Sequence, residues 1–119
     1  MTDKRVLLVE DERELREVLA LTLRRAGYIV DLAPTATEAQ QLLDSQFYAL
    51  VLADWRLPDG NGIDVADRAA KLRAKTIIIS GYAFGLPAGA AERHGIITKP
   101  VATYDLVAAI QRTIGNPGS

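Results

Sequence analysis

The 119 residues predict an α/β fold with a five-stranded, doubly wound parallel sheet that carries helices on both of its faces. The main observation is alternation, because five short apolar runs are separated by segments whose apolar residues recur every three or four positions. Repeated strand and helix units of this kind form parallel sheets covered by helices on both sides. A second observation is that three of these runs end in charged residues, which a buried strand does not keep without a use.

The first two strand and helix units follow directly from the pattern. The run Val6–Val9 predicts a strand, and the helical spacing of apolar residues over 15–26 predicts a helix that Gly27 ends. Residues 28–32 predict the second strand. The segment Thr35–Glu38 resembles a capping box, in which a hydroxyl and a carboxylate three positions apart start a helix.

The next two units are also regular. The apolar run Ala49–Ala53 predicts a third strand that ends at Asp54, and a loop over 58–62 follows it. Apolar residues at helical spacing over 63–72 predict the third helix. Residues 76–79 predict the fourth strand, so the alternation continues through the middle of the chain.

The last third of the chain is less regular. Glycine and proline residues between Ser80 and Lys99 predict a fourth helix that is short, displaced or mobile. Residues 96–98 predict the fifth strand, and Thr103 is expected to cap a last helix that Gly115 ends. We expect one domain over residues 1–115, with 116–119 as a tail of linker composition.

Composition excludes several classes of function. The formal net charge is -1 and the pI about 5.8, so we expect no basic surface for direct nucleic-acid binding. The chain has no cysteine, which excludes disulfides, thiolate zinc sites and a catalytic thiol. We expect no signal peptide, no membrane segment and a cytoplasmic location.

The charged and hydroxyl residues after the strands predict a site. Glu10 and Asp11 follow the first strand, Asp54 the third, Ser80 the fourth and Lys99 the fifth. The carboxyl ends of parallel strands meet at one edge, where ligands bind. Clustered carboxylates repel one another unless a hard cation such as Mg²⁺ lies between them. Beside such an ion, Asp54 can act as the nucleophile of in-line phosphoryl transfer, with Lys99 and Ser80 contacting phosphoryl oxygens.

In isolation, each of these motifs has an ordinary explanation. Glu10 and Asp11 can favour the positive N-terminus of the next helix, with Glu14 completing a cap. Lys99 can belong to a simple strand exit, and Ser80 to a local turn. Their joint order along the chain favours the site.

These residues resemble the receiver domain of two-component response regulators over essentially the whole chain. The shared motifs are Glu10-Asp11, Asp54 with Leu57-Pro58-Asp59-Gly60, Ser80-Gly81 and Lys99-Pro100. The resemblance implies a flavodoxin-like sheet with strand order 2-1-3-4-5, similar to chemotaxis regulators.

The resemblance also implies the chemistry. Asp54 is expected to accept a phosphoryl group from a sensor histidine kinase or a histidine phosphotransfer protein, in a Mg²⁺-dependent step that switches contacts with an unknown effector. The metal ligands implied are Asp11, Asp54 and the backbone carbonyl of Arg56, with Glu10 acting through water. Ser80 and Lys99 are the implied switch and catalytic residues, and no activity beyond the domain's own phosphorylation and dephosphorylation is expected.

Three features depart from the family pattern. Many receivers carry an aromatic residue where this chain has Ile96, so the aromatic half of the switch is expected to be missing, with Tyr82 as a conceivable substitute. The bulky side chains of Arg56 and Tyr82 are expected to shield the phosphoryl group from water and prolong its lifetime. Together with the irregular fourth helix, Ile96 predicts a non-standard output face.

Two alternative functions remain open from the sequence. A Mg²⁺-dependent aspartyl phosphatase uses similar groups, although it requires a second acid where Arg56 stands. An unphosphorylated receiver-like interaction module is the other. The only histidine, His94, is interpreted as an exposed residue without a role, and Trp55 is assigned no chemistry. The sequence does not identify the kinase, stimulus, effector, oligomeric state or whether the chain is part of a larger protein.

Overall fold

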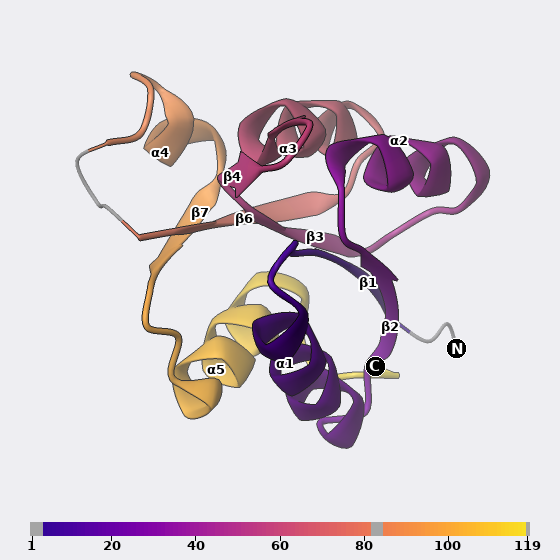
Figure 1. Cartoon of the computed structure of the whole chain (residues 1–119). Helices are drawn as coiled ribbons and strands as arrows, with labels where there is room; N and C mark the ends of the chain where they lie inside the picture. Colours follow the sequence, from indigo (N-terminus) through magenta and orange to yellow (C-terminus); the bar gives the residue numbers. More distant parts are fainter. Residues whose placement is uncertain (1–3, 82–84, 119) are drawn as a thin grey trace.

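The computed structural model describes residues 4–81 and 85–118 (Figure 1). Its main sheet has five parallel strands in the order β2-β1-β3-β6-β7, which in strand sequence is the predicted order 2-1-3-4-5. The strands of this sheet are β1 (Arg5–Val9), β2 (Ile29–Ala33), β3 (Leu50–Asp54), β6 (Lys75–Ser80) and β7 (Gly95–Thr98). The helices are α1 (Arg13–Arg25), α2 (Ala36–Ser45), α3 (Gly62–Lys71), α4 (Ala90–Arg93) and α5 (Thr103–Ile114).

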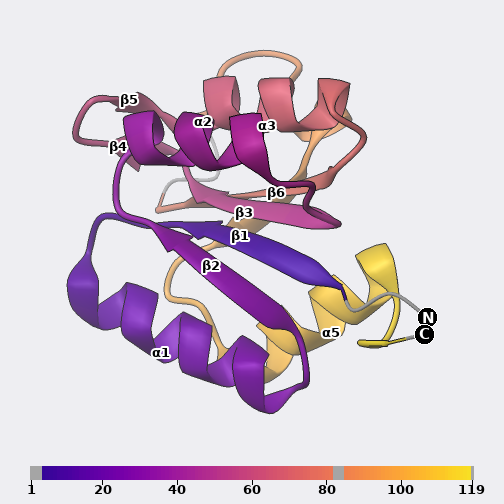
Figure 2. The same ribbon diagram turned by 90° about the vertical axis from the view of Figure 1, so that its right-hand side faces the viewer.

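Helices cover both faces of the sheet, as the doubly wound fold requires. Helices α1 and α5 lie on one face, and α2 and α3 lie on the other, with α4 beyond α3 near the β7 edge (Figures 1 and 2). Alternate residues of the central strands point to opposite faces, so Leu8 and Leu52 join the core under α1 and α5, while Leu7 and Val51 join the core under α2 and α3. Strand β3 is the middle strand of the sheet and all five of its residues are buried, so its last residue, Asp54, lies buried at the centre of the sheet edge.

The predicted elements are confirmed, with differences at their ends. Thr35 accepts a hydrogen bond from the Glu38 backbone N–H and so caps α2 as predicted. The prediction that Thr103 caps α5 is wrong, because Ala102 occupies the cap position and Thr103 is already helical. The fourth helix is short, as predicted, with four residues. Its mobility stays a prediction.

A small hairpin follows β3 where the sequence predicts only a loop. Strands β4 (Arg56–Leu57) and β5 (Gly60–Asn61) pair antiparallel. Two-residue strands carry too little hydrophobic alternation to be recognised from sequence. The hairpin holds the segment directly after Asp54 in a fixed position.

The two ends of the described chain meet at the edge of the sheet opposite Asp54. The Lys4 ammonium donates a hydrogen bond to the Ile114 carbonyl, and the Tyr28 hydroxyl donates one to the Gly115 carbonyl at 2.8 Å. Pro117 lies against Gly27, so the tail predicted from composition packs on the domain. Among the described residues, no helix is long and apolar enough to cross a membrane.

Candidate functional site

Asp54 is the central residue of the site. It ends β3 opposite Ile79 of β6, and its side chain is almost completely buried, with 6% of the residue exposed. One carboxylate oxygen lies 2.7 Å from the Lys99 ammonium, and the other accepts a hydrogen bond from the Arg56 backbone N–H at 3.2 Å. Both oxygens are therefore oriented by groups from two different strand ends.

Lys99 reaches Asp54 from the end of β7. Its backbone N–H donates to the Ser80 carbonyl at 2.9 Å, which fixes the exit of β7 beside β6, and the Lys99–Pro100 peptide bond is cis. Burial alone lowers the pKa of the Lys99 ammonium, but the neighbouring Asp54 and Glu10 carboxylates outweigh it and raise the pKa above its ordinary value. Lys99 is thus a fixed positive charge at the edge of the sheet.

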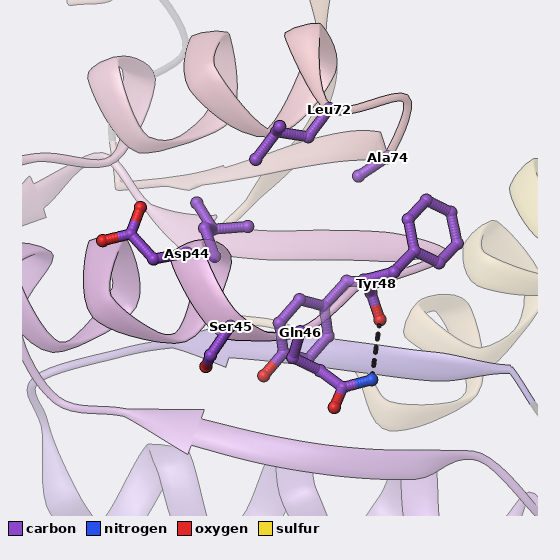
Figure 3. Close-up of a pocket in the computed structure, with 8 residues that line it drawn as sticks. Asp44, Ser45, Gln46, Tyr48, Leu72 and Ala74 are labelled. Atoms are coloured by element: carbon purple, nitrogen blue, oxygen red, sulfur yellow. Dashed lines mark hydrogen bonds between the residues drawn. The ribbon is translucent and has the colours of Figure 1, made fainter.

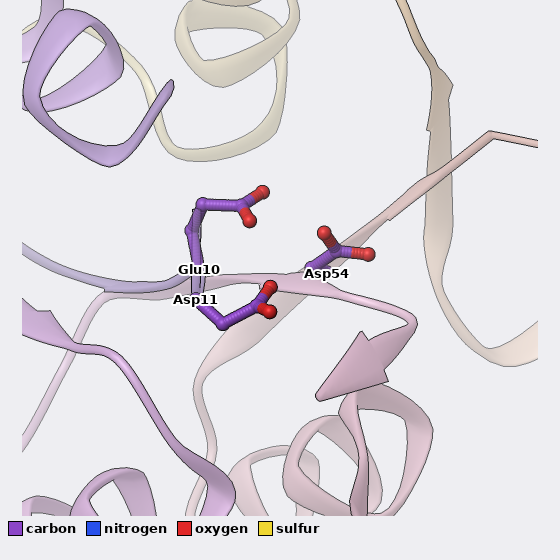
Figure 4. Close-up of side chains that lie close together, drawn as sticks. All are labelled: Glu10, Asp11 and Asp54. Carbon is purple, nitrogen blue, oxygen red and sulfur yellow. The ribbon is translucent and has the colours of Figure 1, made fainter. Parts of the chain in front are cut away.

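Three carboxylates gather at the same place. Glu10, Asp11 and Asp54 each offer an oxygen, and these oxygens lie within 4.8 Å of one another (Figure 4). Glu10 is completely buried, and one of its oxygens accepts from the Glu12 N–H at 3.0 Å. Its other oxygen, Oε1, has no hydrogen-bond partner and lies 3.6 Å from the Lys99 ammonium.

The electrostatics of Glu10 favour a cation at this site. Burial, followed by proximity to Asp54, raises the pKa of Glu10 to about 7. A buried carboxylate oxygen without a donor is unfavourable unless another group satisfies it. An all-oxygen cluster with such an acceptor behind it suits a hard divalent ion such as Mg²⁺. The residues present therefore fit the magnesium site predicted from sequence.

A hollow of about 280 Å³ opens over this cluster. Glu10 and Ser80 are buried beneath the surface and do not line it, although Gly81, the neighbour of Ser80, does. Tyr82, a predicted shielding residue, lies outside the described residues. The hollow is lined by Asp11, Asp54, Trp55, Arg56, Gly81 and Lys99.

Two residues support the site through contacts that were not predicted from sequence: Gly62, which was not recognised, and Asp59, which was quoted only as part of the motif after Asp54. A Cβ added to Gly62 would lie 2.0 Å from the Asp54 carbonyl oxygen, so only glycine fits there. The Gly62 N–H also donates to the Trp55 carbonyl at 2.7 Å. The Asp59 carboxylate accepts from the backbone N–H groups of Ala36 and Thr37, which ties the hairpin to the start of α2. The short spacing of glycines in Gly60-Asn61-Gly62 was the available signal for the first of these.

The interpretation of His94 as an exposed residue is wrong. It is 4% exposed, and its ring nitrogens lie 2.5 Å from the Thr76 hydroxyl and 2.7 Å from the Asp67 carboxylate. Arg93 also donates to Asp67. The polar neighbours of His94 in the sequence suggested a surface position, but polar partners from α3 and β6 satisfy the buried ring. His94 joins α3, β6 and the end of α4, and it is remote from the acidic cluster.

Another hollow, of about 300 Å³, lies at the opposite edge of the sheet (Figure 3). Its wall is formed by residues that precede β3 and β6, including Tyr48, Leu72 and Ala74. The Tyr48 hydroxyl is already engaged, because it donates to Asp31 at 2.7 Å. Ligands of doubly wound sheets bind at the carboxyl ends of the strands, so the hollow at Asp54 is the better candidate site.

The sequence of this chain is similar to those of known proteins over most of its length. Residues 6–111 match the family model described as the response regulator receiver domain. The chain is 34% identical to the transcriptional regulatory protein PmrA of Pectobacterium parmentieri over 97% of its length, and spans 54% of that protein. It is 32% identical to the response regulator receiver protein CpdR of Brucella abortus, with 93% of this chain and 97% of CpdR covered. The chain thus spans about half the length of one relative and nearly all of the other.

Solved structures are similar over almost the whole chain. A CheY-like receiver domain from Methanospirillum hungatei superimposes with a TM-score of 0.85 at 30% identity, and the alignment covers 95% of this chain and 94% of that one. The response regulator TrrA from Thermotoga maritima was solved in complex with Mg²⁺ and BeF. It superimposes with a TM-score of 0.83 at 28% identity, and the alignment covers 92% of this chain and 98% of TrrA.

Proposed function

Because this chain belongs to the response regulator receiver domain family, we propose that Asp54 accepts a phosphoryl group from a phosphohistidine and that this modification switches protein contacts. The observation that carries the proposal is the position of the Asp54 carboxylate, 2.7 Å from the Lys99 ammonium and beside Glu10 and Asp11. The donor is a sensor histidine kinase or a histidine phosphotransfer protein.

The chain's own residues contribute positioning and charge. An Asp54 oxygen attacks phosphorus, the N–P bond of the phosphohistidine breaks, and the leaving imidazole nitrogen takes up a proton. The Lys99 ammonium, held beside the carboxylate, stabilises negative charge on the phosphoryl oxygens. The Ser80 hydroxyl, at the end of β6, is the proposed hydrogen-bond donor to the product. In-line transfer requires orientation and charge neutralisation more than a strong base.

Asp11, Asp54 and the Arg56 carbonyl would hold Mg²⁺, with Glu10 acting through a water molecule. The orphaned oxygen of Glu10 and the closeness of the three carboxylates support this assignment. Bound Mg²⁺ supplies positive charge that offsets repulsion between the carboxylates and the incoming phosphoryl group. TrrA, solved with Mg²⁺ and BeF, is a relative of similar structure that supports the same assignment.

The experiment that tests the proposal is intact mass after incubation with Mg²⁺ and acetyl phosphate. The expected result is one phosphoryl adduct in the parent protein, which disappears without Mg²⁺ and in Asp54→Asn. Asp105→Asn is a matched control, because Asp105 is an exposed carboxylate on α5. An adduct that persists in Asp54→Asn, or no adduct even with a phosphorylated histidine kinase as donor, contradicts the proposal.

Stoichiometry, measured as adduct on the protein and as turnover of excess phosphomonoester, separates the two alternatives. A Mg²⁺-dependent aspartyl phosphatase turns over many equivalents of a phosphomonoester, whereas a receiver takes up one phosphoryl group and loses it slowly. An unphosphorylated interaction module does neither. The residue two positions after Asp54 is Arg56, where a phosphatase needs a second acid, so the receiver function is the one we favour.

A further inference from the structure

Arg56 and Trp55 form a contact at the mouth of the hollow. The guanidinium carbon of Arg56 lies 5.0 Å from the centroid of the Trp55 indole ring, which is the geometry of a cation–π interaction. Both residues line the hollow that contains Asp54. The Arg56 side chain is exposed, and it forms no ion pair with any residue that the structure describes. Within the described part of the chain, the contact of its guanidinium is therefore the one with the indole ring.

Trp55 connects the hollow to a separate apolar cluster. It is partly buried and packs against a cluster of four buried residues that come from α3, β6 and α4. Leu86, which precedes α4, and Ile96 of β7 pack against the same cluster. The buried members of this cluster are Ile63, Ala66, Ile78 and Ala90. Trp55 thus contacts both the hollow at Asp54 and the cluster on the α4–β7 side of the molecule.

Two partners compete for the Arg56 guanidinium after phosphorylation. An exposed cation–π contact is a weak interaction. A guanidinium can donate two parallel charge-assisted hydrogen bonds to one phosphoryl group, and each of these is stronger than a neutral hydrogen bond. A phosphoryl group on Asp54 is therefore the stronger partner for the Arg56 guanidinium. Because the cation–π contact that Arg56 gives up is weak, the change is reversible.

We infer that Arg56 and Trp55 couple the acceptor site to the α4–β7 face, an inference that rests on the proposed phosphorylation of Asp54. Arg56 leaves the indole ring for the phosphoryl oxygens, and Trp55 repacks against the cluster that it shares with α4 and β7. In this scheme Arg56 contacts the phosphoryl group directly, and Trp55 responds to its departure. Trp55 supplies the aromatic side chain that position 96 lacks in this chain, where the residue is Ile96.

The first test uses the fluorescence of Trp55, which is the only tryptophan in the chain. Emission is measured with Mg²⁺ alone and then with Mg²⁺ plus saturating beryllofluoride, whose fluorides stand in for phosphoryl oxygens. The parent protein is expected to change its emission on adding beryllofluoride. Arg56→Ala is expected to lose most of this change per bound adduct, and Arg56→Lys to retain part of it because the charge remains.

Arg25→Ala is the matched control for the loss of an exposed arginine. Arg25 is exposed at the C-terminal end of α1, away from the hollow, so this variant should respond as the parent does. Urea midpoints without beryllofluoride establish that each variant is folded. If Arg56 had a purely structural role, replacing it would leave the emission change caused by beryllofluoride unaltered.

The second test is amide exchange at residues 90–98. In the parent, beryllofluoride is expected to change the exchange protection of these amides. Trp55→Phe is expected to keep this change because an aromatic ring remains, and Trp55→Ala is expected to lose it. An emission change in Arg56→Ala equal to that of the parent overturns the inference alone. Absence of a phosphoryl adduct in the parent, measured by mass, overturns the proposed function and this inference together.

Discussion

Glu10 carries the strongest conflict between burial and charge in the site. Its residue is completely buried, one oxygen has no donor, and its pKa is raised to about 7 from an ordinary value of 4.5. The folded protein therefore binds a proton at Glu10 more tightly than the unfolded chain does. Without metal, the contribution of Glu10 to stability is most favourable below pH about 4.5 and declines as the pH rises through about 7.

We predict that Glu10→Gln stabilises the metal-free protein at pH 8 by an amount on the order of 2 kcal/mol, because a neutral amide replaces a buried charge. The free energy of unfolding should also lose its decline between about pH 4.5 and 7. Urea unfolding in a chelator measures both. Glu14→Gln, an exposed change on α1, should leave the pH dependence intact. A Glu10→Gln protein with the parent's pH profile contradicts the assignment of that profile to Glu10.

Among the glycines compared for an added side chain, Gly62 has the least room. An added Cβ would lie 2.0 Å from the Asp54 carbonyl oxygen, which is backbone and cannot rotate away. We predict that Gly62→Ala lowers the free energy of unfolding by about 1–3 kcal/mol, as overpacking does elsewhere. Gly81→Ala is the control, since nothing lies within 4 Å of its added Cβ. Equal urea midpoints for Gly62→Ala and the parent would falsify this packing argument.

At the scale of elements, Asp67 ties α4 to α3. Its carboxylate accepts hydrogen bonds from the Nε2–H of His94 at 2.7 Å and from the Nε–H of Arg93 at 3.0 Å. A carboxylate only accepts, so the His94 proton lies on Nε2, and in the neutral ring Nδ1 accepts from the Thr76 hydroxyl. The pKa of Asp67 is lowered because hydrogen bonds from Arg93 and His94 outweigh the effect of burial. This contact joins the four-residue helix α4 and the residue after it to α3.

We predict that Asp67→Ala destabilises the protein by about 1–3 kcal/mol, because it leaves the buried N–H of His94 without an acceptor. Amides of residues 90–94 should exchange faster, while those of α5 remain as in the parent. Asp105→Ala on α5 is the control for loss of an exposed carboxylate. Unchanged exchange at residues 90–94 in Asp67→Ala means that another contact positions α4.

Elements with long periodic patterns were predictable, and those set by side-chain partners were not. The five strands and α1, α2, α3 and α5 follow from apolar spacing, because burial of one face determines them. The start of α5 was misplaced by one residue, since a threonine near a helix start can cap it or join it. The β4–β5 hairpin was not predicted, because its two-residue strands carry too little hydrophobic alternation to be recognised.

For the whole molecule, the candidate site was predictable because sheet topology brings strand ends together. Five of its residues, Glu10, Asp11, Asp54, Ser80 and Lys99, were identified from their places after strands, and the roles proposed for them stay predictions. The environment of His94 was not predictable, because its partners come from 18 and 27 positions away in the chain. The cation–π contact of Arg56 also required side-chain geometry.

Ligand binding at the acidic cluster should stabilise the entire fold. We predict that Mg²⁺ at a concentration one hundred times its dissociation constant raises the free energy of unfolding by about 2.7 kcal/mol. This value follows because the ion binds the folded state and not the unfolded chain. Asp11→Asn should lose most of this gain, and Asp105→Asn should keep it. Urea titrations with and without Mg²⁺ measure the difference. Equal gains in Asp11→Asn and the parent place the ion elsewhere.

The meeting of the chain ends at the edge opposite Asp54 has a practical consequence. Lys4 contacts the Ile114 carbonyl, so the two ends of the folded domain are neighbours. Domains with adjacent ends tolerate insertion into a surface loop of a host protein and circular permutation. Grafted by both ends into a fluorescent host, this domain can serve as a genetically encoded reporter, with its ligand-binding edge facing away from the host.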